Sequence, residues 1–177
     1  GLDKMPMPLA TGVYEIGTSS VFVLLYAVML FLLLDMGRLA HLVPKHFVYN
    51  SLLGTLTVLG ILLSVFVYGN IHYNHKVRQE LHLSTSKHLD KPLKVVMISD
   101  LHLGYHNRRA EFARWVDLIN AERPDLVLIA GDIIDISVRP LLEEHVAEEF
   151  RRIKAPIYAC LGNHEYYSNE ARAHKFY

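Results

Sequence analysis

The sequence predicts an α/β domain that follows a helical hairpin long enough to cross a membrane. Two uncharged apolar runs, 17–34 and 51–69, lie early in the chain and have the length of membrane spans. Three shorter apolar runs follow. Each ends in polar residues and lies about 30 residues from the next, the length of one strand–helix–strand unit. We therefore divide the chain into a transmembrane hairpin (1–70), a linker with an entering strand (71–92) and an α/β domain (93–177).

The overall composition bears mainly on partners. The 177 residues include 18 Lys and Arg against 18 Asp and Glu, so the formal net charge of zero gives no reason to expect nucleic acid as a partner. The single cysteine, Cys160, excludes an internal disulfide. It lies in an apolar run, so we expect it to be buried in a strand.

The hairpin follows from the two apolar runs and from what separates them. A buried helix of a soluble protein could have the same composition, but two such runs within one short segment favour membrane spans. Gly37 and Pro44 break the connector between the runs. The outer flanks of the hairpin are therefore expected on the same side of the membrane.

Basic residues near the spans bear on orientation. The connector contains Arg38 and Lys45, and the segment after the second span contains Lys76, Arg78 and Lys87. Cytoplasmic flanks carry an excess of Lys and Arg, so the difference slightly favours a cytoplasmic domain but is too small to decide the side. We expect an integral membrane protein of the bacterial inner membrane.

The linker after the second span partly alternates apolar and polar residues. Val77, Gln79 and Leu81 would share one face of an extended segment, which predicts a strand entering the sheet. The histidines of the linker lack a fixed ligand spacing, so we expect them to be surface residues and not metal ligands.

The three apolar runs of the domain, 94–98, 125–130 and 156–161, favour buried parallel strands. Ligands of such sheets lie beyond the carboxyl ends of the strands. The polar residues at those ends are Asp100, His102, Asp132, Asn163 and His164. Oxygen and nitrogen donors of this kind suit divalent metals, and one aspartate between two ligand sets is what a two-metal hydrolytic centre needs.

Two helices are expected between these strands. Asn107 is the expected N-cap of the first, and its core face has helical spacing: Phe112, Trp115, Val116 and Ile119. Pro140 suits the first turn of the second, whose core face comprises Leu142, Val146, Phe150 and Ile153. A solvated acidic face is expected from Glu143, Glu144, Glu148 and Glu149.

Three motifs in order resemble those of the calcineurin-like metallophosphoesterases. They are Asp100-Leu101-His102, Gly131-Asp132-Ile133-Ile134-Asp135 and Gly162-Asn163-His164-Glu165, which match D-x-H, G-D-x-x-D and G-N-H-D/E. Any one motif would be a weak signal, but three in order after strands are specific. The resemblance covers 93–177 and implies the first half of an α/β/β/α sandwich. The remaining metal ligands are expected beyond Tyr177, so we expect the stretch in hand to be inactive by itself.

The resemblance also implies roles for individual residues. Asp100 and His102 would bind a first metal, Asp132 would bridge to a second, and Asn163 would bind the second. His164 would protonate the leaving oxygen or contact the phosphate. Two divalent ions (Mn, Fe, Zn or Mg) are implied.

Two supporting carboxylates are expected beside these ligands. Asp135 would orient His102 from outside the ligand set, and Glu165 is expected to support the loop instead of taking part directly.

The arginines after the first motif have two alternative interpretations. Arg108 and Arg109 could hold the substrate phosphate through paired hydrogen bonds, or they could be a solvated basic pair.

The function expected is hydrolysis of a phosphate mono- or diester by a membrane-anchored, metal-dependent hydrolase. The anchor makes a lipid-linked ester one hypothesis for the substrate. The alternative is a catalytically inactive membrane module that acts in binding or scaffolding. Metal content distinguishes the two.

Overall fold

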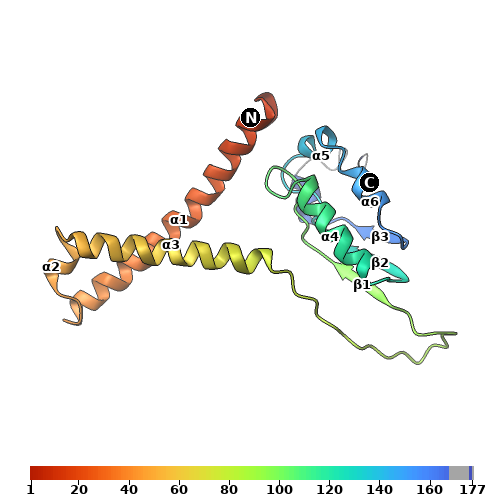
Figure 1. Ribbon diagram of the computed structural model, residues 1–177, viewed down its shortest axis with the longest axis horizontal. Coiled ribbons are helices and arrows are strands. Elements are labelled where there is room, and N and C mark those ends of the chain that lie inside the picture. Colours follow the sequence, from red (N-terminus) through yellow and green to blue (C-terminus); the bar gives the residue numbers. More distant parts are fainter. Residues whose placement is uncertain (168–175, 177) are drawn as a thin grey trace. The chain divides into compact units, whose positions relative to one another are not determined.

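The computed structural model describes residues 1–167 and 176 and divides the chain into two compact units (Figure 1). One unit comprises residues 17–86, and the other comprises residues 1–16 together with 87–177. The last part of the predicted domain, 168–175 and 177, lies outside the described residues.

The hairpin unit is built on two long helices. After a 3-10 turn at Leu2–Lys4, α1 spans Met7–Leu39 and α3 spans Leu52–Asn74, with the short α2 (Lys45–Val48) between them. At a rise of about 1.5 Å per residue the two long helices measure about 50 and 35 Å, enough to cross a bilayer. Both are therefore candidate membrane spans.

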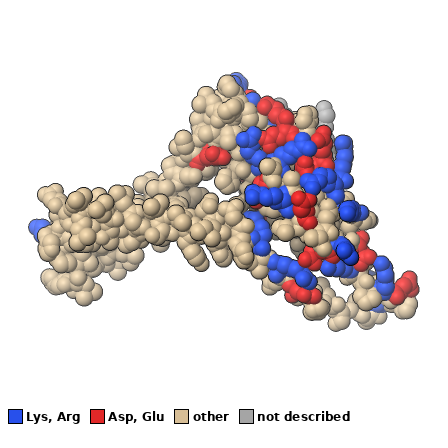
Figure 2. Space-filling view, in the orientation of Figure 1, with Lys and Arg blue, Asp and Glu red and all other residues tan. Residues whose placement is uncertain are grey.

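Both helices extend beyond the apolar runs that predict them. Helix α1 begins ten residues before the run at 17–34. Pro8 is compatible with this start, because it lies in the first turn, where the backbone N–H that proline lacks is not needed. Helix α3 begins where Ser51 Oγ accepts a hydrogen bond from Gly54 N at 3.0 Å. Figure 2 shows charged side chains gathered mainly on the α/β unit, in keeping with a stretch 17–74 whose Asp, Glu, Lys and Arg residues are Asp35, Arg38 and Lys45.

The strand predicted in the linker is wrong. The structure assigns no strand between α3 and Val95, and Val77 and Leu81 are exposed. Alternation alone does not form a strand, because a strand is stable only when a neighbour pairs with its backbone.

The sheet of the α/β unit is as predicted. Its strands are β1 (Val95–Ile98), β2 (Leu126–Ala130) and β3 (Ile157–Cys160), and they are parallel in the order β1-β2-β3. Val95 pairs with Leu126 and Val127 pairs with Ile157. Along the chain, two long apolar helices are thus followed by a mixed α/β unit, which is consistent with part of a metallophosphoesterase domain.

Helices α4 (Arg109–Ala121), α5 (Arg139–Glu143), α6 (Ala147–Arg151) and α7 (Asn163–Tyr167) complete the described unit. The core lies between the sheet and the first of these helices, as Figure 1 shows for α4. It contains the predicted face of α4, with Phe112, Val116 and Ile119 packed near Val127 and Ile129.

Three details of the predicted packing are wrong. Asn107 does not cap α4; its Nδ2 donates to Leu101 O at 3.0 Å, and Arg108 stands at the N-cap position. Leu142 is exposed because the single predicted helix is two short ones, which breaks the helical spacing. Cys160 is exposed as well.

The strands are less buried than their apolar sequences predict. Val95 and Met97 of β1 are exposed, whereas Val96 and Ile98, which alternate with them, pack against the core. The described helices α4 and α6 cover only one face of the sheet, so alternate side chains face solvent. The exposure of Cys160 at the end of β3 has the same cause.

Candidate metal centre

The polar tips of the first two strands are joined by backbone hydrogen bonds. Asp100 N donates to Gly131 O at 3.4 Å, and His102 N donates to Asp132 O at 2.9 Å. Asp100, His102 and Asp132 all have positive φ, at 56°, 42° and 52°. This left-handed backbone is rare outside glycine. It turns the chain sharply at each strand end.

The second and third tips are packed glycine against glycine. Gly131 has φ of 76°, and a Cβ there would lie 2.8 Å from Gly162 Cα. A Cβ on Gly162 would lie 2.2 Å from Asp132 Oδ1. Both positions therefore require glycine, because any side chain would force the loops apart.

Glu165 holds the same two loops together. Its fully buried carboxylate accepts hydrogen bonds from Asp132 N at 3.1 Å, Ile134 N at 2.8 Å and Gly162 N at 2.7 Å. Asp132 Oδ1 in turn accepts from His164 N at 3.0 Å. The expectation that Glu165 supports loop geometry is confirmed.

The loops bring three potential ligands together. One ligand atom each from His102, Asp132 and His164 lies within 4.8 Å of the others, and all three side chains are half-buried. The imidazole rings of His102 and His164 are 4.4 Å apart between centroids and nearly perpendicular. His164 Nδ1 is buried without a hydrogen-bond partner.

The donor set fits a divalent cation. Zinc binds imidazole nitrogen and carboxylate oxygen at about 2.0–2.2 Å, so the ligand atoms of one ion lie within about 4 Å of each other. The three ligand atoms, now within 4.8 Å of one another, would need to draw together by about 1–1.5 Å to share one ion.

Comparison with known proteins agrees with this geometry. Residues 93–177 match the family model described as calcineurin-like phosphoesterase. Residues 93–177 belong to the calcineurin-like phosphoesterases. No solved structure matches the chain.

Similar proteins include bacterial and animal ones. An uncharacterized metallophosphoesterase of Campylobacter jejuni is 34% identical over 124 residues, which is 67% of this chain and 33% of that protein. A transmembrane protein with metallophosphoesterase domain of Danio rerio is 37% identical over 43% of this chain and 17% of that protein. Its counterpart in Bos taurus is 33% identical over 44% of this chain and 18% of that protein. The chain therefore spans a third or less of these relatives.

The other two ligands expected in the phosphoesterase segment lie at the edge of this cluster. Asp100 is exposed, and its Oδ1 lies 3.7 Å from His102 Nε2. Asn163 is exposed at the first residue of α7, next to His164. Asp100 is two residues from His102, and Asn163 begins the helix that carries His164.

The partner of Asp135 differs from the one implied by the family resemblance. Asp135 Oδ1 lies 3.4 Å from His164 Nδ1, without the alignment of a hydrogen bond, and Oδ2 accepts a hydrogen bond from Tyr14 Oη. The carboxylate therefore stands beside His164, whereas His102 was expected. Sequence reasoning missed Tyr14, which lies 121 residues from Asp135 and carries no local motif.

The arginines of the phosphoesterase segment are held by carboxylates. Arg108 pairs with Glu144, and Arg109 pairs with Glu148 at 2.7 Å and with Glu149 at 2.8 Å. Glu149 is buried, so the prediction of a wholly solvated acidic face is wrong. Hydrogen bonds from Arg152 and Arg109 lower the pKa of the Glu149 carboxyl. Arg108 is exposed and Arg109 is half-buried, and each is paired with carboxylate side chains.

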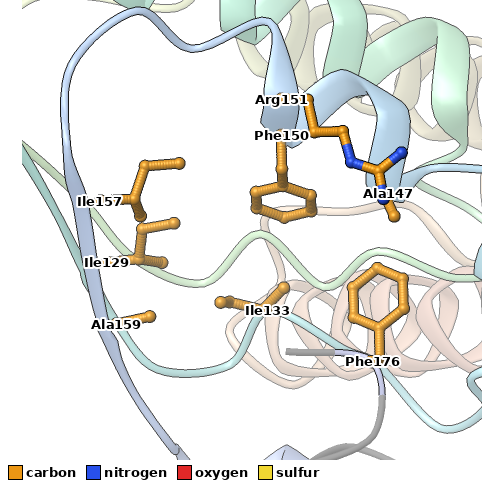
Figure 3. Close-up of a pocket in the computed structure, with 8 residues that line it drawn as sticks. All are labelled: Ile129, Ile133, Ala147, Phe150, Arg151, Ile157, Ala159 and Phe176. Carbon is orange, nitrogen blue, oxygen red and sulfur yellow. The ribbon is translucent and has the colours of Figure 1, made fainter.

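A separate hollow of about 430 Å³ lies between β2, β3 and α6. Figure 3 shows its lining, which is apolar apart from Arg151 and contains none of the clustered ligands. Among the described residues, this lining offers neither a carboxylate nor an imidazole to a metal.

Proposed function

We propose that this chain is part of a membrane-anchored, metal-dependent phosphoric ester hydrolase that cleaves a phosphate mono- or diester with the help of two divalent ions. The observation that carries the proposal is the convergence of His102, Asp132 and His164 within 4.8 Å at the carboxyl ends of three parallel strands. Family membership of 93–177 supports the same chemistry.

Each residue has a physical task in this proposal. When bound, divalent ions make water a strong nucleophile at neutral pH and offset charge on the phosphoryl oxygens. His102 and Asp132 would hold them, with Asp100 and Asn163 as further donors. Asp132 is fixed for this by Glu165 behind it and by the His164 amide.

His164 would supply the proton. Imidazole titrates near neutral pH and can protonate the leaving oxygen of the ester. The Asp135 carboxylate, 3.4 Å from its Nδ1, would stabilise the protonated ring.

The test uses the purified full-length protein. With p-nitrophenyl phosphate and bis-p-nitrophenyl phosphate, we expect hydrolysis that a chelator abolishes and that Mn²⁺, Fe²⁺, Zn²⁺ or Mg²⁺ restores. Asp132→Asn should reduce the rate more than about 100-fold, beyond the loss typical of residues outside the ligand set. The control is Asp90→Asn, a fully exposed aspartate in the linker.

Metal content decides against the inactive alternative. Mass spectrometry of the full-length protein should find two ions per chain, and fewer in Asp132→Asn. Protein that retains no metal under metal-replete conditions would reject the hydrolase and support the scaffold.

The membrane part of the proposal is supported by the two candidate spans and by the names of the transmembrane relatives. We place the protein in the bacterial inner membrane with a lipid-linked ester as substrate. Washing membranes with alkaline carbonate should fail to extract the protein if it is an integral membrane protein. The purified protein should hydrolyse phospholipid esters in vesicles if its substrate is lipid-linked. Turnover of soluble esters alone would reject the lipid-linked substrate. Protease accessibility in inverted vesicles reports the side.

A further inference from the structure

The first 16 residues pack against the loops of the metal centre, within the same compact unit. Asp3 Oδ1 accepts hydrogen bonds from Tyr105 Oη at 2.9 Å and from Ser137 Oγ at 2.8 Å. Arg139 donates to the backbone oxygens of Leu2 at 3.2 Å and Met5 at 2.7 Å. Four hydrogen bonds thus fix the chain just before α1 begins.

The first turns of α1 present one face to the same loops. Ala10 and Thr11 are its buried residues. Tyr14 follows them by four and three positions, so it lies on the same face of the helix. Its ring lies 5.6 Å from the ring of the buried Tyr105. The start of α1 is therefore packed against these loops, and Tyr14 reaches Asp135 from it.

The Asp135 carboxylate connects this helix to His164. Its Oδ2 accepts the hydroxyl proton of Tyr14, and its Oδ1 lies 3.4 Å from His164 Nδ1. Asp135 itself is buried and fixed through its backbone N, which donates to Leu103 O at 3.0 Å. Tyr14 therefore holds one oxygen of the carboxylate while the other lies next to the imidazole.

We propose that Tyr14 is a positioning residue for His164, acting through Asp135, so that the beginning of the membrane helix is part of the catalytic unit. The inference rests on the proposed function of His164. It agrees with the hairpin, because two spans return the chain to the side on which it began. Residues 1–16 can therefore meet the α/β unit without crossing the bilayer.

The test is Tyr14→Phe in the full-length protein, which removes one hydroxyl and keeps the ring. The first readout is the imidazole nitrogen NMR spectrum of metal-free protein in detergent, with the His164 signals assigned by their loss in His164→Gln. We expect those signals to move in Tyr14→Phe and the signals of the other histidines to stay. The control is Tyr26→Phe, also in α1, whose ring packs edge-on against Phe66.

The second readout is turnover of p-nitrophenyl phosphate. Partners outside the ligand set typically contribute about 10–100-fold, so we expect kcat to fall about tenfold in Tyr14→Phe while KM changes less than twofold. Asp3→Asn weakens the hydrogen bonds that Asp3 accepts from Tyr105 and Ser137, and it does not contact His164. It should move the His164 signals in the same direction by a smaller amount.

The outcomes separate the two proposals. Unchanged His164 signals in Tyr14→Phe overturn the positioning role whatever the activity, and so does a moved signal with unchanged kcat. A wild-type protein without phosphoesterase activity rejects the proposed function. In that case moved His164 signals still support the coupling of Tyr14 to the imidazole.

Discussion

Gly162→Ala tests the packing that holds the metal-centre loops together. The added Cβ would lie 2.2 Å from Asp132 Oδ1 and 2.6 Å from Asp132 N. Atoms in ordinary contact lie about 3.5 Å apart, so the loops would have to separate by about 1 Å. The backbone nitrogen cannot move aside as a side chain could, and the Glu165 and His164 hydrogen bonds across the gap would lengthen with it.

The magnitude follows from these contacts. Overpacking of this kind costs about 1–3 kcal/mol of unfolding free energy, and a ligand misplaced by about 1 Å can cost about 100-fold in rate. Trp115, the single tryptophan, packs on Phe112 in α4 and reports unfolding of the α/β unit in urea. Metal retention after dialysis should fall in parallel.

Gly104→Ala is the matched control. Its Cβ would lie 3.2 Å from Asp135 Cβ, a contact that a shift of a few tenths of an ångström relieves, so we expect a smaller effect on both measurements. If Gly162→Ala unfolds at the same urea concentration as the wild type and retains its metal, the glycine-to-aspartate packing is wrong.

Three further predictions concern the groups around this centre. Glu165→Gln leaves one acceptor oxygen for three backbone donors and should lower stability by about 1–3 kcal/mol in the same assay, whereas Glu80→Gln on the exposed linker should not. Arg109→Met should lower the urea midpoint slightly and leave KM unchanged, because the arginine binds Glu148 and Glu149; a tenfold rise in KM would instead restore the phosphate-binding interpretation. The pKa of Glu149 is lower in the folded state than its ordinary value of about 4.3. The ionised carboxylate therefore stabilises the fold fully above that ordinary value, and this stabilisation is lost as the pH falls through the lower folded pKa. Urea midpoints should fall on acidification in the wild type and less steeply in Glu149→Gln, and equal slopes would contradict this role.

The sequence predicts the ends of the strands better than the surfaces they bury. Each apolar run stops at a polar residue, and the structure ends β1, β2 and β3 close to those points. Burial depends on what lies across the sheet, which a run such as Val95–Ile98 does not encode. For the same reason Cys160 is expected to be buried from its apolar run but is exposed in the structure.

The site divides along a similar line. His102, Asp132 and His164 could be predicted together because parallel strands deliver their carboxyl ends to one edge. The partner of Asp135 could not, because it depends on how left-handed residues turn each loop. Tyr14 could not either, since its hydrogen bond to Asp135 spans 121 residues of sequence.

The left-handed backbone at Asp100, His102 and Asp132 has an evolutionary consequence. Each such residue stores about 1–3 kcal/mol of strain, which glycine would relieve. Selection for thermal stability alone would therefore favour replacing these residues, and the side chains that could bind a cation would be lost. A screen of this unit for hardier variants should accumulate glycine or asparagine at these positions and lose its metal as it gains heat resistance.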